Sequence, residues 1–241
     1  MPLPFFYKED LTATRTDFVL DEATSKYMVQ VLRMQNGGQL QWTNGKGILF
    51  TAAITDNNRK KCSVRILQTT NSPQGPADKP QTPNICIAIS PVKNNTRFEW
   101  FLEKATEIGV SEIIPLICIR TEKTAFKFDS MKSILVSAML QSQQCWLPVL
   151  HEPTKFNALV TSSTHQQKFI AHCIDDAKRS LADLNNESLS SKIILIGPEG
   201  DFTTDEIELA LQNHYSAVSL GATRLRTETA GIVAATLLCL V

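Results

Sequence analysis

The sequence lacks the cysteine and histidine patterns that are typical of disulfide-rich and metal-binding proteins. Its six cysteines, at positions 62, 86, 118, 145, 173 and 239, include no C-x-x-C pair, and its four histidines form no H-E-x-x-H arrangement. Several cysteines lie in apolar runs, such as the one around Cys86. We therefore expect small buried hydrophobic side chains rather than disulfides, and we expect no metal ion.

Three common signatures of nucleotide-binding and hydrolytic enzymes are also missing. No G-x-G-x-x-G follows the first strand expected in the α/β region, and no G-x-x-x-x-G-K-[ST] occurs. These absences argue against a Rossmann dehydrogenase and a P-loop nucleoside triphosphatase. There is no G-x-S-x-G, which argues against an α/β-hydrolase.

Long apolar runs and a net charge are absent as well. No run approaches the roughly 20 apolar residues that cross a bilayer, and the N-terminus lacks the pattern of a secretory signal. We therefore expect a cytoplasmic protein with no membrane partner. The whole chain is neutral, with 24 basic and 24 acidic side chains, but residues 1–70 carry a charge of +3. This excess of positive charge is compatible with an N-terminal module that binds nucleic acid, although basic side chains that contact only solvent would give the same charge.

Turn residues and hydrophobic periodicity divide the chain into three parts. Short β-prone segments between Gln39 and Gln68, after a short helix from Thr24 to Met34, predict a small β-barrel over residues 1–70. Residues 71–83 are rich in proline and lack large apolar side chains, which is typical of a linker. Over residues 84–241 strands alternate with helices, which predicts a largely parallel sheet covered on both faces.

The last predicted helix, Glu228 to Leu240, has no polar face. From Ala230 onward only Gly231 and Thr236 interrupt its apolar residues. A helix of this kind must be covered by protein on nearly all sides. Burial in the monomer and burial in a subunit interface explain it equally well.

Two loops at the carboxyl ends of predicted strands form the candidate site, because parallel α/β sheets bind ligands at that edge. The first, IGPEGDF at 196–202, has two glycines that allow close approach of a ligand to the backbone. The second, LGATRLRTETAG at 220–231, places Arg224 and Arg226 just ahead of a helix N-terminus, where the helix dipole disfavours cations. An anion site would explain the two arginines, and so would an ion pair with Glu228.

Four segments together carry a resemblance to a known family: VQVLRMQNGGQL (29–40), FEWFLEKATEIGV (98–110), IGPEGDFT (196–203) and LGATRLRTETAG (220–231). In this order they resemble the ribosomal RNA small-subunit methyltransferase E family of the SPOUT superfamily, whose members methylate N3 of a uridine in 16S ribosomal RNA during ribosome biogenesis. The resemblance implies an N-terminal PUA-like barrel, a C-terminal sheet with a trefoil knot, S-adenosyl-L-methionine as cofactor, and a homodimer.

The resemblance, the chemistry of the reaction and the basic excess before residue 70 together lead us to expect roles for individual residues. We expect Arg226 to stabilise the uracil anion, and Glu199 or Glu228 to orient Arg226 or accept the proton. We expect the cofactor to be held by Ile196, Gly197, Pro198, Glu199, Gly200, Leu220, Gly221, Leu225, Thr227, Ala230 and His172. We expect RNA contacts from Arg33, Arg59, Lys60, Lys61, Arg65, Arg224 and Gln144.

The chain departs from the family pattern at three places. Asp201 follows G-P-E-G where a second glycine is common, QQCWL at 143–147 replaces the usual E-Q-x-x-R, and Tyr27 replaces a histidine. We expect these changes to affect RNA contacts rather than the cofactor site. Two other functions stay open: a sister SPOUT enzyme that methylates a ribose 2′-hydroxyl, and an RNA-binding assembly factor without activity.

Overall fold

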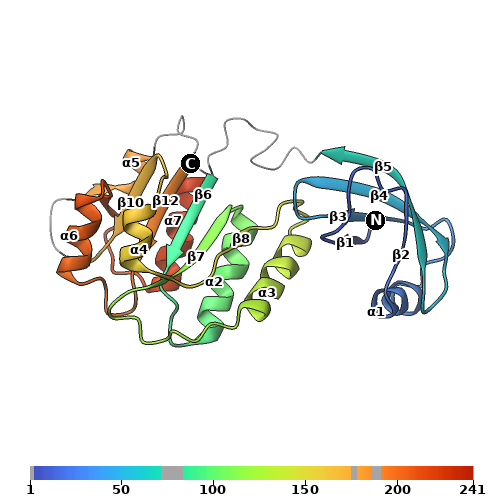
Figure 1. Ribbon diagram of the computed structural model, residues 1–241, viewed down its shortest axis with the longest axis horizontal. Coiled ribbons are helices and arrows are strands. Elements are labelled where there is room, and N and C mark those ends of the chain that lie inside the picture. Colours follow the sequence, from blue (N-terminus) through green and yellow to red (C-terminus); the bar gives the residue numbers. More distant parts are fainter. Residues whose placement is uncertain (1–2, 72–83, 175–177, 186–190, 241) are drawn as a thin grey trace. The chain divides into compact units, whose positions relative to one another are not determined.

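The computed structural model describes residues 3–71, 84–174, 178–185 and 191–240 (Figure 1). Two compact units divide the chain. The first contains the N-terminal residues together with residues 139–146, and the second contains the rest of the chain. The expected linker, residues 71–83, lies outside the described residues except for Asn71.

A curled five-stranded sheet in the order β1-β3-β4-β5-β2 forms the described part of the first unit. β1 runs parallel to β3, and the other neighbours are antiparallel. The pairing of β4 with β5 contains register shifts of the kind that bend a strand and increase its twist, and the sheet packs against a core that includes Trp42 and Phe50. The strands are β1 (Phe5–Tyr7), β2 (Asp17–Val19), β3 (Gln39–Thr43), β4 (Ile48–Asp56) and β5 (Ser63–Asn71).

The single helix expected in this unit is divided. α1 (Glu22–Lys26) begins after Asp21, whose side chain accepts a hydrogen bond from the Thr24 N–H, and it passes into a π-helical turn, η1 (Tyr27–Val31). The chain then takes a left-handed conformation at Arg33, with φ 54°. This conformation ends the helical region before Met34.

Residues 139–146 belong to the first unit, although the sequence analysis assigned them to the α/β domain. The Cys145 carbonyl accepts hydrogen bonds from Thr43 Oγ1 at 3.1 Å and from the Gly47 N–H at 2.9 Å. A Cβ on Gly47 would overlap the Trp146 ring, so that ring packs directly on the backbone after β3. These contacts join residues about 100 positions apart, and local sequence patterns do not predict them.

The second unit is built on an eight-stranded sheet in its described residues, in the order β11-β13-β10-β12-β6-β7-β8, with β9 paired to β7. Every pair of neighbouring strands is parallel, as the sequence analysis predicted. The strands are β6 (Asn84–Ile89), β7 (Glu112–Ile117), β8 (Val149–Leu150), β9 (Thr154–Lys155), β10 (Gln167–Ala171), β11 (Arg179–Ser180), β12 (Ser191–Ile196) and β13 (Ser216–Ser219).

Helices cover both faces of this sheet (Figure 1). Along β6, Ile87 belongs to the apolar cluster on one face and Cys86 to the cluster on the other, because successive side chains of a strand point to opposite sides. α2, α3, α5 and α7 contribute to the first cluster, and α4 and α6 to the second. The helices are α2 (Asn95–Ile108), α3 (Phe128–Gln141), α4 (Phe156–Ser162), α5 (Leu181–Leu184), α6 (Thr204–Gln212) and α7 (Thr227–Cys239).

α7 packs closely on α2 and β6 because one of its residues has no side chain. A Cβ at Gly231 would lie 2.7 Å from Phe101 Cε2 and 2.8 Å from Ile89 Cδ1. Burial of Ala234 and Leu238 continues the contact. The opposite side of α7 is only half-buried, and Leu240 after it is 67% exposed, so the monomer covers the helix on part of its surface.

The trefoil knot concerns how the chain is threaded, which strand order and register do not describe, and it stays a prediction. Among the described residues, no helix has the length and apolar character that crossing a bilayer requires.

Replacing Gly231 tests the close packing of α7. Gly231→Val should lower the free energy of unfolding by about 1–3 kcal/mol, because the added carbons overlap Phe101 and Ile89 in a filled core. Urea unfolding measures this loss. Thr229→Val is a matched control, since it places the same side chain on a half-buried position of the same helix and should change stability by about 0.5 kcal/mol at most. Equal stability of the two variants would contradict the packing described.

Candidate functional site

Three loops meet at one edge of the parallel sheet. β13, β10 and β12 are neighbours and run in the same direction, so their carboxyl ends lie side by side. Residues 172–174 follow β10, residues 197–203 follow β12, and residues 220–226 follow β13. This is the edge at which parallel α/β sheets bind ligands.

Two adjoining cavities open among these loops, with volumes of about 400 and 420 Å³. Both volumes lie in the usual range for small-molecule sites, about 300–1,000 Å³. The cavities share five residues in their walls, namely Ala171, Cys173, Arg224, Leu225 and Ala230. Because they share these residues, the two cavities lie next to each other at the edge of the sheet.

The cavities bring together most of the residues that the sequence analysis assigned to the cofactor. The first is lined by Ile196, Gly197, Pro198, Glu199, Leu225, Thr227 and Ala230. The second is lined by His172, Leu220 and Gly221 as well as by Leu225 and Ala230. Gly200 lines neither cavity, and its carbonyl instead accepts a hydrogen bond from Arg120.

The loop after β12 is joined to the start of α7. Thr227 Oγ1 donates a hydrogen bond of 3.1 Å to the Gly197 carbonyl, and this contact is buried. A Cβ at Gly197 would come within 3.1 Å of the Phe202 ring, so glycine lets the loop fold back over that buried ring. Thr203 then begins α6 with the expected capping box, since its hydroxyl and the Glu206 carboxylate each accept the other residue's backbone N–H. The loop is therefore fixed at its start by the Thr227 hydrogen bond and at its end by the capping box of α6.

Asp201 ties this loop to the loop after β10. Its backbone is left-handed, with φ 63°, a conformation that glycine adopts without strain. Its carboxylate accepts hydrogen bonds of 2.8 Å from the Cys173 N–H and from the Phe202 N–H. Asp201 also lines the first cavity. The departure from glycine therefore lies in the wall of this cavity, and the expectation that it affects RNA contacts rather than the cofactor site stays a prediction.

A third arginine, which the sequence analysis missed, reaches the first cavity from α2. Arg97 lies one residue before the matched segment 98–110, and it lines the cavity beside Arg226. Its Nη1 is 3.7 Å from Glu199 Oε1, and its Nε is 3.7 Å from Glu228 Oε1. The packing of α2 against α7 brings Arg97 to Glu228, and helical periodicity carries no signal for that contact.

The two candidate glutamates have different surroundings. The Glu228 side chain is 8% exposed and lines neither cavity, whereas Glu199 is 46% exposed and lines the first cavity. In the described part of the chain, Glu228 Oε2 has no hydrogen-bond partner. The ion pair considered between Glu228 and an arginine of its own loop is replaced by one with Arg97.

The two arginines of the second loop are exposed at the cavities. Arg226 lines the first cavity, and Arg224 lines both. Among the described residues neither has an ion pair, and the Arg226 backbone carbonyl accepts the first hydrogen bond of α7 from Ala230. Both guanidinium groups are therefore available to a ligand in the cavities.

The other expected RNA contacts lie in the first unit. Arg59, Lys60 and Lys61 are exposed in the turn between β4 and β5, where Asn58 Oδ1 accepts hydrogen bonds from both lysine N–H groups. Arg65 pairs with Asp17 at 2.8 Å and lowers the pKa of that carboxyl. Arg33 and Gln144 also belong to this unit. The expected RNA residues are thus divided between two units, with Arg224 alone at the cavities.

The cysteines fit the expectation of buried hydrophobic side chains in most cases. Burial raises the pKa of the Cys86 and Cys118 thiols, and Cys62 and Cys145 are buried as well. Cys239 is partly buried, and Cys173 is exposed in the wall that both cavities share. No group of three or more possible metal-binding side chains occurs among the described residues.

Comparison with known proteins gives matches to both parts of the chain. A family described as "RNA methyltransferase domain" matches residues 79–239, and one described as "RNA methyltransferase PUA domain" matches residues 20–67. The ribosomal RNA small subunit methyltransferase E of Synechocystis is 30% identical over 220 residues, which cover 89% of this chain and 70% of that protein.

Solved structures match over nearly the whole chain. A probable rRNA-methyltransferase from Porphyromonas gingivalis has a TM-score of 0.87 and 34% identity, covering 97% of this chain and 96% of its own. The ribosomal RNA small subunit methyltransferase E from Neisseria gonorrhoeae, bound to S-adenosyl methionine, has a TM-score of 0.82 and 25% identity, covering 97% and 95%. The α/β class and the N-terminal PUA domain are therefore as the sequence analysis predicted.

Substitutions at Asp201 separate its backbone conformation from its hydrogen bonds. Asp201→Gly loses both carboxylate contacts, and Asp201→Ala loses them and also places a Cβ in a left-handed backbone. The alanine variant should therefore be less stable than the glycine variant by about 1–2 kcal/mol in urea unfolding. Asp201→Asn keeps one acceptor oxygen and should lose least. Equal stability of the alanine and glycine variants would show that residue 201 is not held at positive φ.

Proposed function

The chain belongs to the ribosomal RNA small subunit methyltransferase E family, and from this premise we propose that it transfers a methyl group from S-adenosyl-L-methionine to N3 of a uridine in 16S ribosomal RNA. One observation carries the proposal. Both loops of the family pattern line two adjoining cavities at the ligand-binding edge of the sheet, with exposed arginines beside them. The substrate would place the protein in the bacterial cytoplasm.

The cavity walls suit an elongated cofactor with apolar and polar ends. Ala171, Leu225 and Ala230 give the shared wall an apolar surface, and the loop backbones at Gly197 and Leu220 offer peptide groups. S-adenosylmethionine would supply an electrophilic methyl group on a sulfonium. In this proposal the residues around Gly197 and Leu220 hold and orient the cofactor, and the charged side chains at the first cavity receive the base.

Arg226 is proposed to stabilise negative charge on the uracil. N3 of uracil is an imide nitrogen and a weak acid, so it becomes a good nucleophile only when it loses its proton. A guanidinium directed at a carbonyl oxygen of the base favours the anion, because the negative charge spreads onto that oxygen. Arg226 suits this role, since it lines the first cavity and is exposed.

RNA binding and a homodimer complete the proposal. The exposed basic turn at residues 59–61 of the PUA domain is proposed to contact phosphates. For the dimer, Val233, Thr236 and Leu240 share one incompletely buried side of α7, and Trp100 on the neighbouring α2 is 44% exposed. Leu238 is 2% exposed inside the monomer, so it belongs to the core rather than to this surface.

The identity of the product tests the proposed function. Purified protein with S-adenosylmethionine and small-subunit RNA or subunits, taken from cells that lack the enzyme, should produce 3-methyluridine, detected by mass spectrometry of nucleosides. Arg226→Ala should lower the single-turnover rate by roughly 100- to 1,000-fold, the usual effect of losing one charge-stabilising group, with cofactor affinity nearly unchanged. Arg226→Lys should recover little, because an ammonium lacks the planar fork of the guanidinium.

Arg224→Ala is the control for Arg226, because it removes an exposed arginine of the same loop. We expect it to affect RNA binding more than turnover. A 2′-O-methylated nucleoside as the product would favour the sister enzyme class. Binding of cofactor and RNA without any methyl transfer would favour the assembly factor.

The exposed thiol of Cys173 gives a separate test of the cofactor position. A maleimide should label Cys173 first, because four of the other cysteines are buried and Cys239 is partly buried. At a concentration about 20 times its Kd, S-adenosylmethionine should slow this labelling about 20-fold, since only the free protein reacts. A Cys173→Ser variant should lose the fast-labelling site. Labelling that is unaffected by a saturating cofactor would place the cofactor elsewhere.

A further inference from the structure

Arg97 connects three segments that lie far apart in the sequence. It projects from α2 into the wall of the first cavity, where it meets Glu199 of the loop after β12 and Glu228 of the first turn of α7. Both nitrogen-to-oxygen distances are 3.7 Å, so the contacts are ion pairs rather than hydrogen bonds. The guanidinium therefore lies between two carboxylates at the edge of the candidate site.

The two carboxylates that Arg97 contacts differ in their exposure to solvent. Glu228 is almost buried behind the cavity wall, and Glu199 faces the cavity. A buried carboxylate is costly unless a cation pairs with it, so Glu228 favours the position of Arg97 beside it. Glu199 is half exposed and would move freely without a partner, so the same guanidinium restricts it.

From this geometry we propose that Arg97 is a positioning residue. Glu228 anchors Arg97 from behind the wall, and Arg97 holds the Glu199 carboxylate at the cavity, where it accepts the proton of the uridine. This inference rests on the proposed function and assigns the two glutamates, which the sequence leaves interchangeable, to different tasks. In the reaction, N3 gives its proton to Glu199 and bonds to the methyl carbon, while the carbon–sulfur bond breaks with its electron pair left on sulfur.

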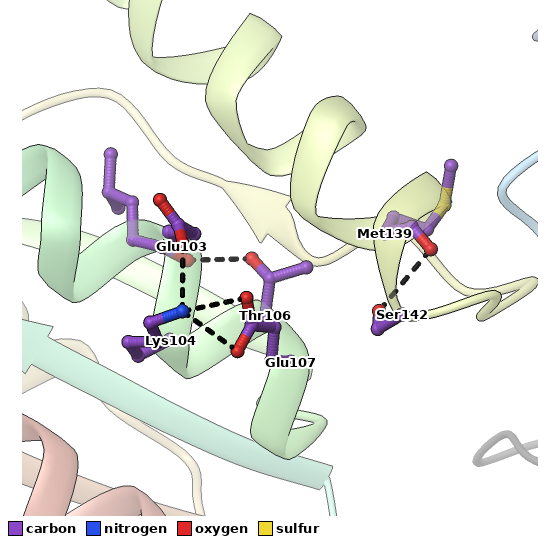
Figure 2. Close-up of polar contacts among 7 residues, drawn as sticks. Glu103, Lys104, Thr106, Glu107, Met139 and Ser142 are labelled. Carbon is purple, nitrogen blue, oxygen red and sulfur yellow. Dashed lines mark hydrogen bonds and ion pairs between the residues drawn. The ribbon is translucent and has the colours of Figure 1, made fainter.

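A second cation on α2, Lys104, forms ion pairs away from the cavities. Lys104 Nζ lies 2.7 Å from Glu103 Oε1 and 3.0 Å from Glu107 Oε1, as Figure 2 shows. Its partners are on the same helix, and none of the three residues lines a cavity. Lys104 therefore provides a matched control, because it is also a cation between two carboxylates on α2.

Single-turnover rates of Arg97 and Glu199 variants at saturating cofactor and RNA test the proposal. Glu199→Gln should slow methyl transfer by roughly 100-fold or more, the usual contribution of a general base. Arg97→Met should slow it by about 10- to 100-fold while the KM for S-adenosylmethionine stays within about twofold, and Arg97→Lys should recover part of the rate. The double variant should be no slower than Glu199→Gln, since Arg97 acts through that carboxylate. Lys104→Met should stay within about twofold of wild type.

Several results would overturn the proposal. Multiplicative rate losses in the double variant would show that Arg97 acts independently of Glu199. A loss confined to the KM for the cofactor would make Arg97 a cofactor ligand. An equal loss of rate in Lys104→Met would show that both variants slow the reaction by destabilising α2.

Failure of the proposed function can be recognised separately. If the wild type methylates another atom of the RNA, the uridine-N3 proposal fails, and the same variants still report on Arg97 in that transfer. If no methyl transfer occurs, urea unfolding of Arg97→Met, Glu228→Gln and their double variant tests the contact between Arg97 and Glu228. The midpoint shift of the double variant should be smaller than the two single shifts added together, and additive shifts would contradict the contact.

Discussion

The close approach of α7 to α2 and β6 is the constraint on which the rest of the candidate site depends. It requires residue 231 to lack a side chain, because Phe101 and Ile89 occupy the space that a Cβ would enter. The first turn of the same helix carries Thr227 and Glu228. When α7 packs in this position, Thr227 donates a hydrogen bond to the loop after β12 and Glu228 forms an ion pair with Arg97. Core packing and site geometry are therefore set by one contact.

The loops around the cavities are held by specific contacts rather than by regular secondary structure. Thr227 holds the Gly197 carbonyl, and Asp201 holds the Cys173 N–H. The first contact joins a loop to a helix and the second joins two loops, so both restrict the cavity walls. Such preorganisation favours catalysis, since a reaction between two bound partners depends on their relative placement. The exposed side chains at the rim, such as Arg224 and Arg226, remain free of ion pairs within the described residues and are available to substrate.

Much of the architecture could be predicted from local patterns. Strands alternating with helices predicted a parallel sheet covered on both faces, and glycine-bearing loops after β12 and β13 pointed to the edge of the sheet at which the two cavities open. Both inferences depend on periodicity and on the common direction of parallel strands. The pattern of residues 24–34 predicted one helix, but the helix passes into a π-helical turn at Tyr27–Val31, in which Met28 is buried in the core, and hydrophobic periodicity does not distinguish the two helix types.

The sequence by itself determined the fold class, the position of the two loops and the family, because these follow from residue spacing and from motifs that are contiguous in the chain. Only the tertiary structure decided that Arg97 reaches the cavity, that Glu228 is buried while Glu199 is not, and that residues 139–146 join the first unit. These features depend on contacts between residues 100 or more positions apart. Long-range packing sets which elements become neighbours, and no local pattern of hydrophobic and polar residues carries that information.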